Sequence, residues 1–319
     1  MQKEKTAKPA KRFSKFNLGK KIFITATVIW PIIHFLIFWV YINLDTITLS
    51  FQRFSMNKGK YVFVGWKNYE GLFELLFKGY PDKTLQNAVK NSLSLFVSSN
   101  MILLPISIVC GYVLYKRVFA SAAFRVVFYL PSIISIVVLT MCFKFMFDPN
   151  IGLISPMLEK IGLGKLIPEY GWFKNEKTAW GMVITYSLWA GVGYNVLLLT
   201  GAFTRIPTDL IESAHLDGIG FWRELWSITL PLIGSTINTL IVVGTTAVLT
   251  QFLQPMMLTG EGQEGATSTI AYYITALVKN GTNGLPSAAT IGVFFSVVAI
   301  PIILGFRKLL DKLLPAIEF

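Results

Sequence analysis

Apolar residues in this chain gather into six long windows that contain no Asp, Glu, Lys or Arg, and shorter polar segments separate these windows. A bilayer core about 30 Å thick needs roughly 20 apolar residues per helix, with a range of about 17–25. The strict polar and apolar alternation of a membrane β-barrel is missing. The pattern therefore predicts an all-α polytopic membrane protein with six transmembrane helices. The windows are Ile22–Asn43, Ser92–Tyr115, Val126–Phe143, Thr178–Thr204, Leu225–Gly260 and roughly Asn280–Phe306.

Three windows depart from the ideal length or position. The first follows a basic segment, as a signal peptide would, but its apolar run is too long for a signal core and no small-residue cleavage pattern follows. We therefore expect a retained helix. The third window is short, but Lys144 can extend its charge toward the membrane surface. The fifth is too long for one helix, so we expect part of it to be a loop at the membrane edge.

Composition and charge agree with a membrane protein. The 319 residues are 53% hydrophobic and 14% charged, whereas soluble domains carry about 25% charged residues. The net charge of +12 is unevenly placed, since eight Lys/Arg lie in residues 1–21. This bias is typical of cytoplasmic segments and predicts two cytoplasmic termini. We expect residues 1–21 to be a basic tail that contacts anionic lipid rather than nucleic acid, 22–311 to form one transmembrane domain, and 312–319 to be a short cytoplasmic tail.

Several kinds of chemistry lack their residues. No Gly-x4-Gly-Lys-Ser/Thr phosphate loop occurs, the two histidines are far apart, and the two cysteines lie in apolar windows. No carboxylate lies in the middle of a window, although ion-driven carriers usually need one. We therefore expect no metal site and no enzyme, and any uphill transport would take its energy from another chain.

One charged stretch, "LIESAHLDGIGFWRELWSITLPLI" (210–233), interrupts this apolar chain. Pro207 with Thr208 or Asp209 is typical of a helix start, and Glu212 would complete a capping box with Asp209. Gly218 is typical of a helix end or of a close backbone approach. The segment predicts a short amphipathic helix at the inner membrane surface, which is either an aromatic-anchored loop or a docking element for a soluble partner.

The spacing within this stretch resembles the Glu-Ala-Ala-x3-Gly-x9-Ile-x-Leu-Pro signature of ABC importer permeases. Here it runs from Glu212-Ser213-Ala214 through Gly218 to Ile228-Thr229-Leu230-Pro231, and Ser213 in place of alanine is the single departure. Four further segments resemble the carbohydrate (maltose-type) branch: "FVGWKNY" (63–69), "FRVVFYLPSIIS" (124–135), "GLIS" (152–155) and "LTGEGQEGATSTIAYYI" (258–274), in which Glu261 and Gln263 replace the usual glycine and proline.

The resemblance implies the type I importer architecture in the cytoplasmic membrane of a bacterium or archaeon. The coupling helix would span about 207–218 and would contact an ATPase subunit through Glu212, Ser213, Ala214, Asp217 and Gly218. ATP and Mg would be bound in two partner ATPase subunits, with no cofactor in this chain. A second permease subunit would complete a heterodimer, and an extracytoplasmic binding protein would deliver a sugar or oligosaccharide.

The resemblance also implies a substrate path lined by Ser187, Gly191, Tyr194, Gly244, Val248 and Gln251. Aromatic rings suit the apolar faces of sugars, and amides and hydroxyls suit their OH groups. The small residues among them have a second interpretation, since they also let helices pack closely. Other solutes remain open, namely amino acids, peptides or phosphate, as does an ion-coupled secondary carrier. An anionic substrate would favour a cationic cavity, but the fourth and fifth windows contain no Lys or Arg.

Overall fold

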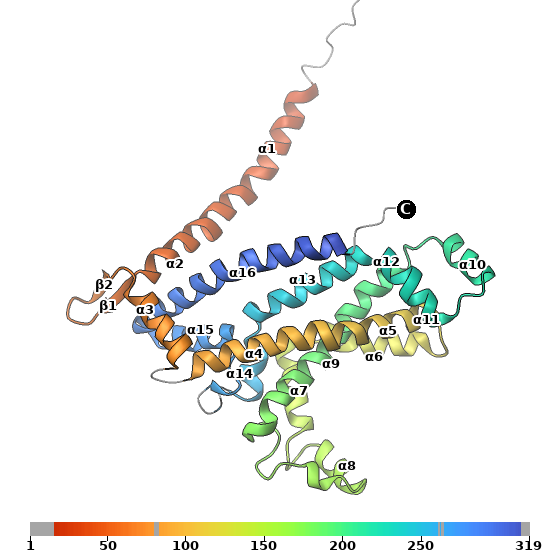
Figure 1. Ribbon diagram of the computed structural model, residues 1–319. Coiled ribbons are helices and arrows are strands. Elements are labelled where there is room, and N and C mark those ends of the chain that lie inside the picture. The colour runs from red at the N-terminus through yellow and green to blue at the C-terminus, as the bar shows by residue number, and fades with distance from the viewer. Residues whose placement is uncertain (1–15, 80–82, 261, 263–264, 314–319) are drawn as a thin grey trace, which may run out of the picture.

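Helices make up most of the described residues, 16–79, 83–260, 262 and 265–313, in a computed structural model of the protein (Figure 1). Segments labelled η are short π- or 3-10 helices. In chain order the elements are α1 (Phe16–Phe35), η1 (Leu36–Tyr41), α2 (Ile42–Ser50), β1 (Gln52–Ser55), β2 (Lys60–Phe63), α3 (Lys67–Phe73), η2 (Glu74–Lys78), α4 (Thr84–Ser98), η3 (Ser99–Leu103), α5 (Leu104–Tyr115), α6 (Ser121–Ile133), α7 (Ile136–Met146), α8 (Ile154–Lys160), η4 (Gly164–Leu166), α9 (Glu176–Phe203), α10 (Thr208–Leu216), α11 (Phe221–Glu224), η5 (Leu225–Thr229), α12 (Leu230–Leu232), α13 (Gly234–Thr250), α14 (Leu253–Leu258), α15 (Ile270–Lys279), η7 (Gly281–Asn283) and α16 (Leu285–Leu313).

The described helices include four that are long and apolar enough to cross a membrane unaided. They are Gly19–Ser50, Thr84–Tyr115, Glu176–Phe203 and Leu285–Lys312. Two bent pairs also qualify, Ser121–Ile133 with Ile136–Met146 and Phe221–Leu232 with Gly234–Ala247. The all-α prediction is confirmed, and counting each bent pair as one span gives the predicted six.

The third window is broken rather than continuous, which the sequence analysis did not predict. Its two halves meet at an angle of 108°. Ile134 and Ser135 have ψ values of 142° and 133°, so the backbone is extended between α6 and α7. The fifth window is divided as expected: its first part bends by 78° after α12, and α13 ends at Thr250 before α14 begins.

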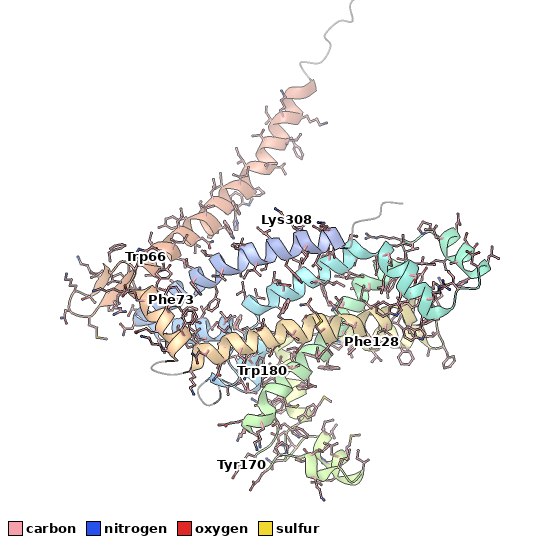
Figure 2. All side chains as sticks on the ribbon, viewed as in Figure 1. Trp66, Phe73, Phe128, Tyr170, Trp180 and Lys308 are labelled. Atoms are coloured by element: carbon pink, nitrogen blue, oxygen red, sulfur yellow. The ribbon has the colours of Figure 1, made fainter. Side chains whose placement is uncertain are left out.

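The first span stands away from the other helices along α1, but packs against α16 through α2 (Figure 1). It runs without interruption through α1, η1 and α2, and its apolar side chains project on all sides (Figure 2). Trp30, for example, is 72% exposed. The helix begins at Phe16, so Lys20 and Lys21 of the predicted basic tail are helical, whereas residues 1–15 and 314–319 of the two predicted tails lie outside the described residues.

A small α/β element covers one end of the bundle. Strands β1 and β2 pair antiparallel with Gln52 opposite Phe63, and α3 follows them. Tyr69 and Leu72 of α3 are buried in a cluster with Leu85 and Ile291. This segment therefore consists of a hairpin followed by a short packed helix.

The opposite end of the bundle holds the largest described core. Helices α5 and α9 pack closely there, since a Cβ on Gly111 would lie 3.4 Å from Leu199. Tyr112 and Phe203 are fully buried in this core, with ring centroids 5.8 Å apart. Ile211 of α10 belongs to the same cluster, so α10 is placed against the ends of α5 and α9.

Candidate functional site: an exposed short helix and a polar cavity

The short helix α10 begins and ends as its backbone requires. Its N-cap is Pro207, without any side-chain cap hydrogen bond, so the predicted capping box is wrong. Glu212 lies too far along the helix to complete one. The C-terminus is closed by Gly218 at φ +73°, where the amides of Gly218 and Ile219 donate to the carbonyls of His215 and Ala214. This is a Schellman motif, and it requires the left-handed conformation that glycine adopts most readily.

The surface of α10 that faces away from the bundle is mostly polar. Ile211 and Ala214 are buried, whereas Glu212, Ser213, Asp217 and Gly218 are exposed. Ser213 Oγ donates to the Asp209 carbonyl at 2.8 Å, so its small side chain stays on the helix. Leu210 of the same helix is 43% exposed. Four of the five predicted coupling residues thus share the exposed surface, and Ala214 packs beneath it.

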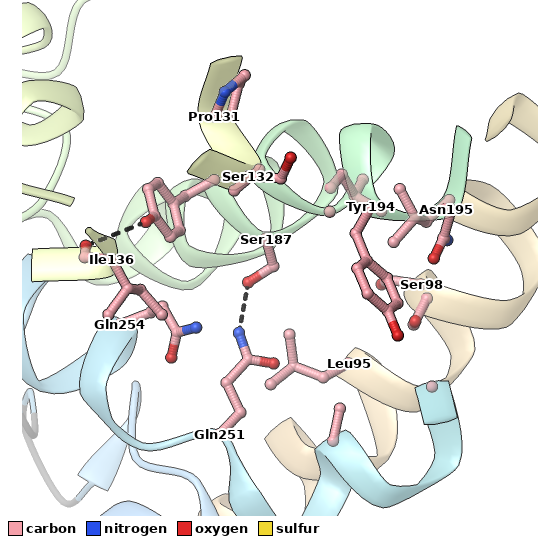
Figure 3. Close-up of a pocket in the computed structure, with 18 of the residues that line it drawn as sticks. Leu95, Ser98, Pro131, Ser132, Ile136, Ser187, Tyr194, Asn195, Gln251 and Gln254 are labelled. Atoms are coloured by element: carbon pink, nitrogen blue, oxygen red, sulfur yellow. Dashed lines mark hydrogen bonds between the residues drawn. The ribbon is translucent and has the colours of Figure 1, made fainter. Parts of the chain in front are cut away.

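A cavity of about 620 Å³ lies among the membrane-spanning helices, between α10 and the β1–β2 end. Its walls come from α4 with η3 and the start of α5, from α6 with α7, from α9, and from α13 with α14 (Figure 3). Five of the six predicted path residues line it: Ser187, Gly191, Tyr194, Gly244 and Gln251. Val248 lies on α13 between the last two, but its side chain is outside the described part of the structure.

Two predicted residues are joined across the cavity wall. Gln251 Nε2 donates to Ser187 Oγ at 2.7 Å, which links the end of α13 to α9. Ser187 Oγ in turn donates to the Val183 carbonyl at 2.8 Å. Tyr194 extends from α9 toward Ser98 (Figure 3) and is 47% exposed. The cavity therefore offers an amide and a phenol that can still form hydrogen bonds with a solute.

The two glycines serve close packing as well as lining the cavity. A Cβ on Gly191 would come within 2.7 Å of Leu103 Cδ2, and one on Gly244 within 2.9 Å of Ser99 Oγ. Both glycines therefore line the cavity and also permit close packing. Gly193 is tighter still, since its Cβ would lie 2.1 Å from the carbonyl oxygen of Phe128, and α6 and α9 can cross there only because the side chain is absent.

Sequence reasoning missed several polar groups of the cavity. Ser98 and Ser99 come from the α4–η3 junction, Ser132 from α6 and Gln254 from α14. The run "SSN" at 98–100 inside an apolar window was an available signal. Asn195, which follows Tyr194 on α9, also lines the cavity.

No Asp, Glu, Lys, Arg or His occurs among the residues that line this cavity in the described part of the chain. Within the same described residues, no group of His, Cys, Asp and Glu is arranged to hold a metal ion. The cavity can therefore contact a solute through apolar surface, the phenol of Tyr194, hydroxyls and amides. Glu261 and Gln263, which depart from the maltose-type pattern, lie outside the described residues.

Comparison with known proteins identifies the family. A model described as "Binding-protein-dependent transport system inner membrane component" matches residues 104–314, about two thirds of the chain. The chain belongs to this family. The permease is 31% identical over 274 residues to the probable ABC transporter permease protein YurN of Bacillus subtilis (strain 168), covering 82% of this chain and 88% of YurN.

Two further relatives extend the comparison. The permease is 28% identical over 235 residues to the maltose/maltodextrin transport system permease protein MalF of Escherichia coli (strain K12), covering 70% of this chain and 43% of MalF. A solved structure of a bacterial ABC transporter involved in the import of the acidic polysaccharide alginate matches with a TM-score of 0.78 at 24% identity, covering 93% of this chain and 98% of that one. The predicted ABC importer permease family and fold are thus confirmed.

Proposed function

We propose that this permease is one of two membrane subunits of an ATP-driven importer that carries a neutral sugar or oligosaccharide into the cytoplasm. The observation that carries the proposal is the cavity between α9 and α13, which combines Tyr194 with the Ser187–Gln251 pair and has no charge among the lining residues that the structure describes. An aromatic ring can stack on the apolar face of a sugar while amides and hydroxyls exchange hydrogen bonds with its OH groups.

The charge of the substrate follows from the same lining. A phosphate, an amino acid or an acidic polysaccharide brings charges that are costly to bury without an opposite charge nearby. The alginate importer is described as importing an acidic polysaccharide, whereas MalF is named for maltose and maltodextrin. The uncharged cavity of this permease favours a solute of the second kind.

Energy would reach the cavity through α10. Its exposed Glu212, Ser213, Asp217 and Gly218 would enter a cleft on an ATPase subunit, with Glu212 paired to a basic side chain there. ATP and Mg²⁺ would be bound by two such ATPase subunits. Both termini would then be cytoplasmic, with the basic N-terminal segment against anionic lipid.

Delivery and pathway would need two more partners. An extracytoplasmic binding protein would dock at the end of the bundle that carries β1 and β2, opposite α10. A second permease, different from this one, would close the other side of the path, since the cavity here is open on one side. The bacterial or archaeal cytoplasmic membrane is the expected location.

Co-purification from native membranes, followed by mass spectrometry and uptake assays in proteoliposomes, tests this proposal. We expect recovery of a second six-span permease and an ATPase, and ATP-dependent uptake of a neutral sugar. Uptake that is competed by phosphate, amino acids or an acidic oligosaccharide, and not by neutral sugars, would refute the substrate class. Recovery of the intact chain without any ATPase would refute the coupling role of α10.

A further inference from the structure

Three polar side chains from distant parts of the chain meet beside α10. The carboxylate of Glu224 on α11 is almost completely buried, with 1% of its side chain exposed. Lys116, which directly follows α5, places Nζ 2.5 Å from Glu224 Oε1. His215 of α10 donates from Nε2 to Glu224 Oε2 at 2.8 Å. Glu224 therefore joins the end of a membrane-spanning helix to the short helix that faces the ATPase.

The ion pair between Lys116 and Glu224 is enclosed by aromatic rings. Lys116 Nζ lies 5.5 Å from the ring centroid of Tyr112 and 6.0 Å from that of Tyr115. Tyr112 is fully buried and lies 4.8 Å from the ring of Phe221, the first residue of α11. Water is largely excluded from the pair, so the attraction between its charges is stronger than it would be at the surface.

A buried ion pair is weak support for stability, because two charges must first be removed from water. Its more dependable effect is geometric, since a carboxylate with one donor on each oxygen holds both donors at fixed distances. Helix α10 buries two apolar side chains against the bundle, Ile211 and Ala214. Such apolar contacts are non-directional, whereas the hydrogen bond between His215 and Glu224 resists sliding of α10 along the bundle.

The link continues from Lys116 into the cavity. Helix α5 packs along α9 through Gly111 and Tyr112. At its other end, α5 begins with Leu104, which lines the cavity together with Leu103 of η3. A displacement of α10 that reaches Lys116 can therefore move one wall of the cavity.

We propose that Glu224 is a positioning residue that transmits movement of α10 to α5 through the Lys116–Glu224–His215 cluster. This inference rests on the proposed function, because it assumes that an ATPase moves α10. Glu224 does not touch the substrate; it acts through the two elements that it holds together.

The test compares native protein with Glu224→Gln in the purified transporter, reconstituted with its ATPase, second permease and binding protein. The measured quantities are sugar transported per ATP hydrolysed and the KM for sugar. Glu224→Gln should lower the transport ratio by roughly 2- to 30-fold, the range that single coupling residues span. The KM should remain unchanged, because the cavity residues are untouched.

Two further variants separate transmission from folding. The exchange Lys116→Glu with Glu224→Lys restores opposite charges and should recover part of the transport ratio. His215→Ala removes one contact from a side chain that is 54% exposed, so it leaves the Lys116 pair intact and should also lower the ratio. The control is Arg307→Gln, which breaks the exposed Arg307–Asp311 pair of 3.9 Å on α16 and should have no effect.

The outcomes distinguish the inference from the proposed function. If the native transporter is active and the transport ratio is the same in Glu224→Gln and His215→Ala as in the native protein, the inference about Glu224 is wrong and the proposed function stands. If Glu224→Gln does not assemble, the result for His215→Ala decides the question. A native complex that neither retains an ATPase nor takes up sugar would instead overturn the proposed function.

Discussion

Replacing Gln251 by leucine removes the amide at the end of α13 and keeps a side chain of similar size. Gln251 Nε2 donates to Ser187 Oγ at 2.7 Å, while Ser187 has its own acceptor in the Val183 carbonyl at 2.8 Å. The Ser187 hydroxyl therefore keeps its own acceptor when the amide is lost. The substitution should act on what the cavity binds rather than on the position of α9.

The size of the effect follows from the hydrogen bonds that remain available. A glutamine amide has two N–H donors and a carbonyl acceptor. Ser187 uses one donor, which leaves one donor and the carbonyl for sugar hydroxyls. Each net hydrogen bond contributes about 0.5–1.5 kcal/mol. Loss of both should cost about 1–3 kcal/mol and raise the KM for sugar roughly 5- to 150-fold.

The assay is sugar uptake by the reconstituted transporter, measured at several sugar concentrations so that KM and maximal rate are separated. Gln86→Leu is the matched control, because Gln86 donates to the Leu76 carbonyl at 2.9 Å in a part of α4 that does not line the cavity. Gln251→Leu should raise KM, and Gln86→Leu should not. A KM for Gln251→Leu equal to that of the native transporter would refute contact between Gln251 and the substrate.

Three other substitutions test the site and its framework. Glu212→Lys should abolish uptake without preventing membrane insertion, because it reverses the charge on the exposed surface of α10; normal uptake by a well-expressed variant would contradict the coupling role. Gly218→Ala should destabilise the end of α10 by about 1–2 kcal/mol, the cost of a left-handed residue, and lower the melting temperature relative to Gly220→Ala, where φ is −79°. Gly193→Ala should destabilise the contact between α6 and α9 by about 1–3 kcal/mol through overpacking. A Cβ at position 201 would meet nothing within 4 Å, so Gly201→Ala is the control. Equal melting temperatures for the two variants would show that α6 and α9 can separate without loss of stability.

The membrane-spanning windows could be read from the sequence because burial in lipid is set by composition along a single helix. Residues 178–204 and 92–115 were predicted as apolar windows; the second lies within one continuous helix, and the first does so up to Phe203. The bends were not predictable in the same way. Ile134 and Ser135 carry no breaking signal of their own, although Pro131 precedes them, yet their backbone is extended.

The exposed helix was the most predictable part of the site, because its determinants are local. Pro207 precedes its first residue. At its end, the amide of Gly218 donates to the carbonyl three positions earlier and the amide of Ile219 to the carbonyl five positions earlier. The cap was predicted wrongly, since a helix can begin without a side-chain acceptor when its first amides face solvent. The cavity was predictable only in part. Ser187 and Gln251 were both named as path residues, but their contact joins positions 64 residues apart and became visible only in the structure.

Glu224 shows why the remaining connection could not be read from the sequence. In the stretch 210–233 it is one of several charged residues, and an exposed place on an amphipathic helix is the ordinary expectation for glutamate. Its burial depends on Lys116, which lies in a different polar segment more than 100 residues earlier. Neither residue alone signals the pair, because each is compatible with a solvated loop. Packing around Tyr112 brings the ends of α5 and α11 together, and this places the Glu224 carboxylate beside Lys116 and His215.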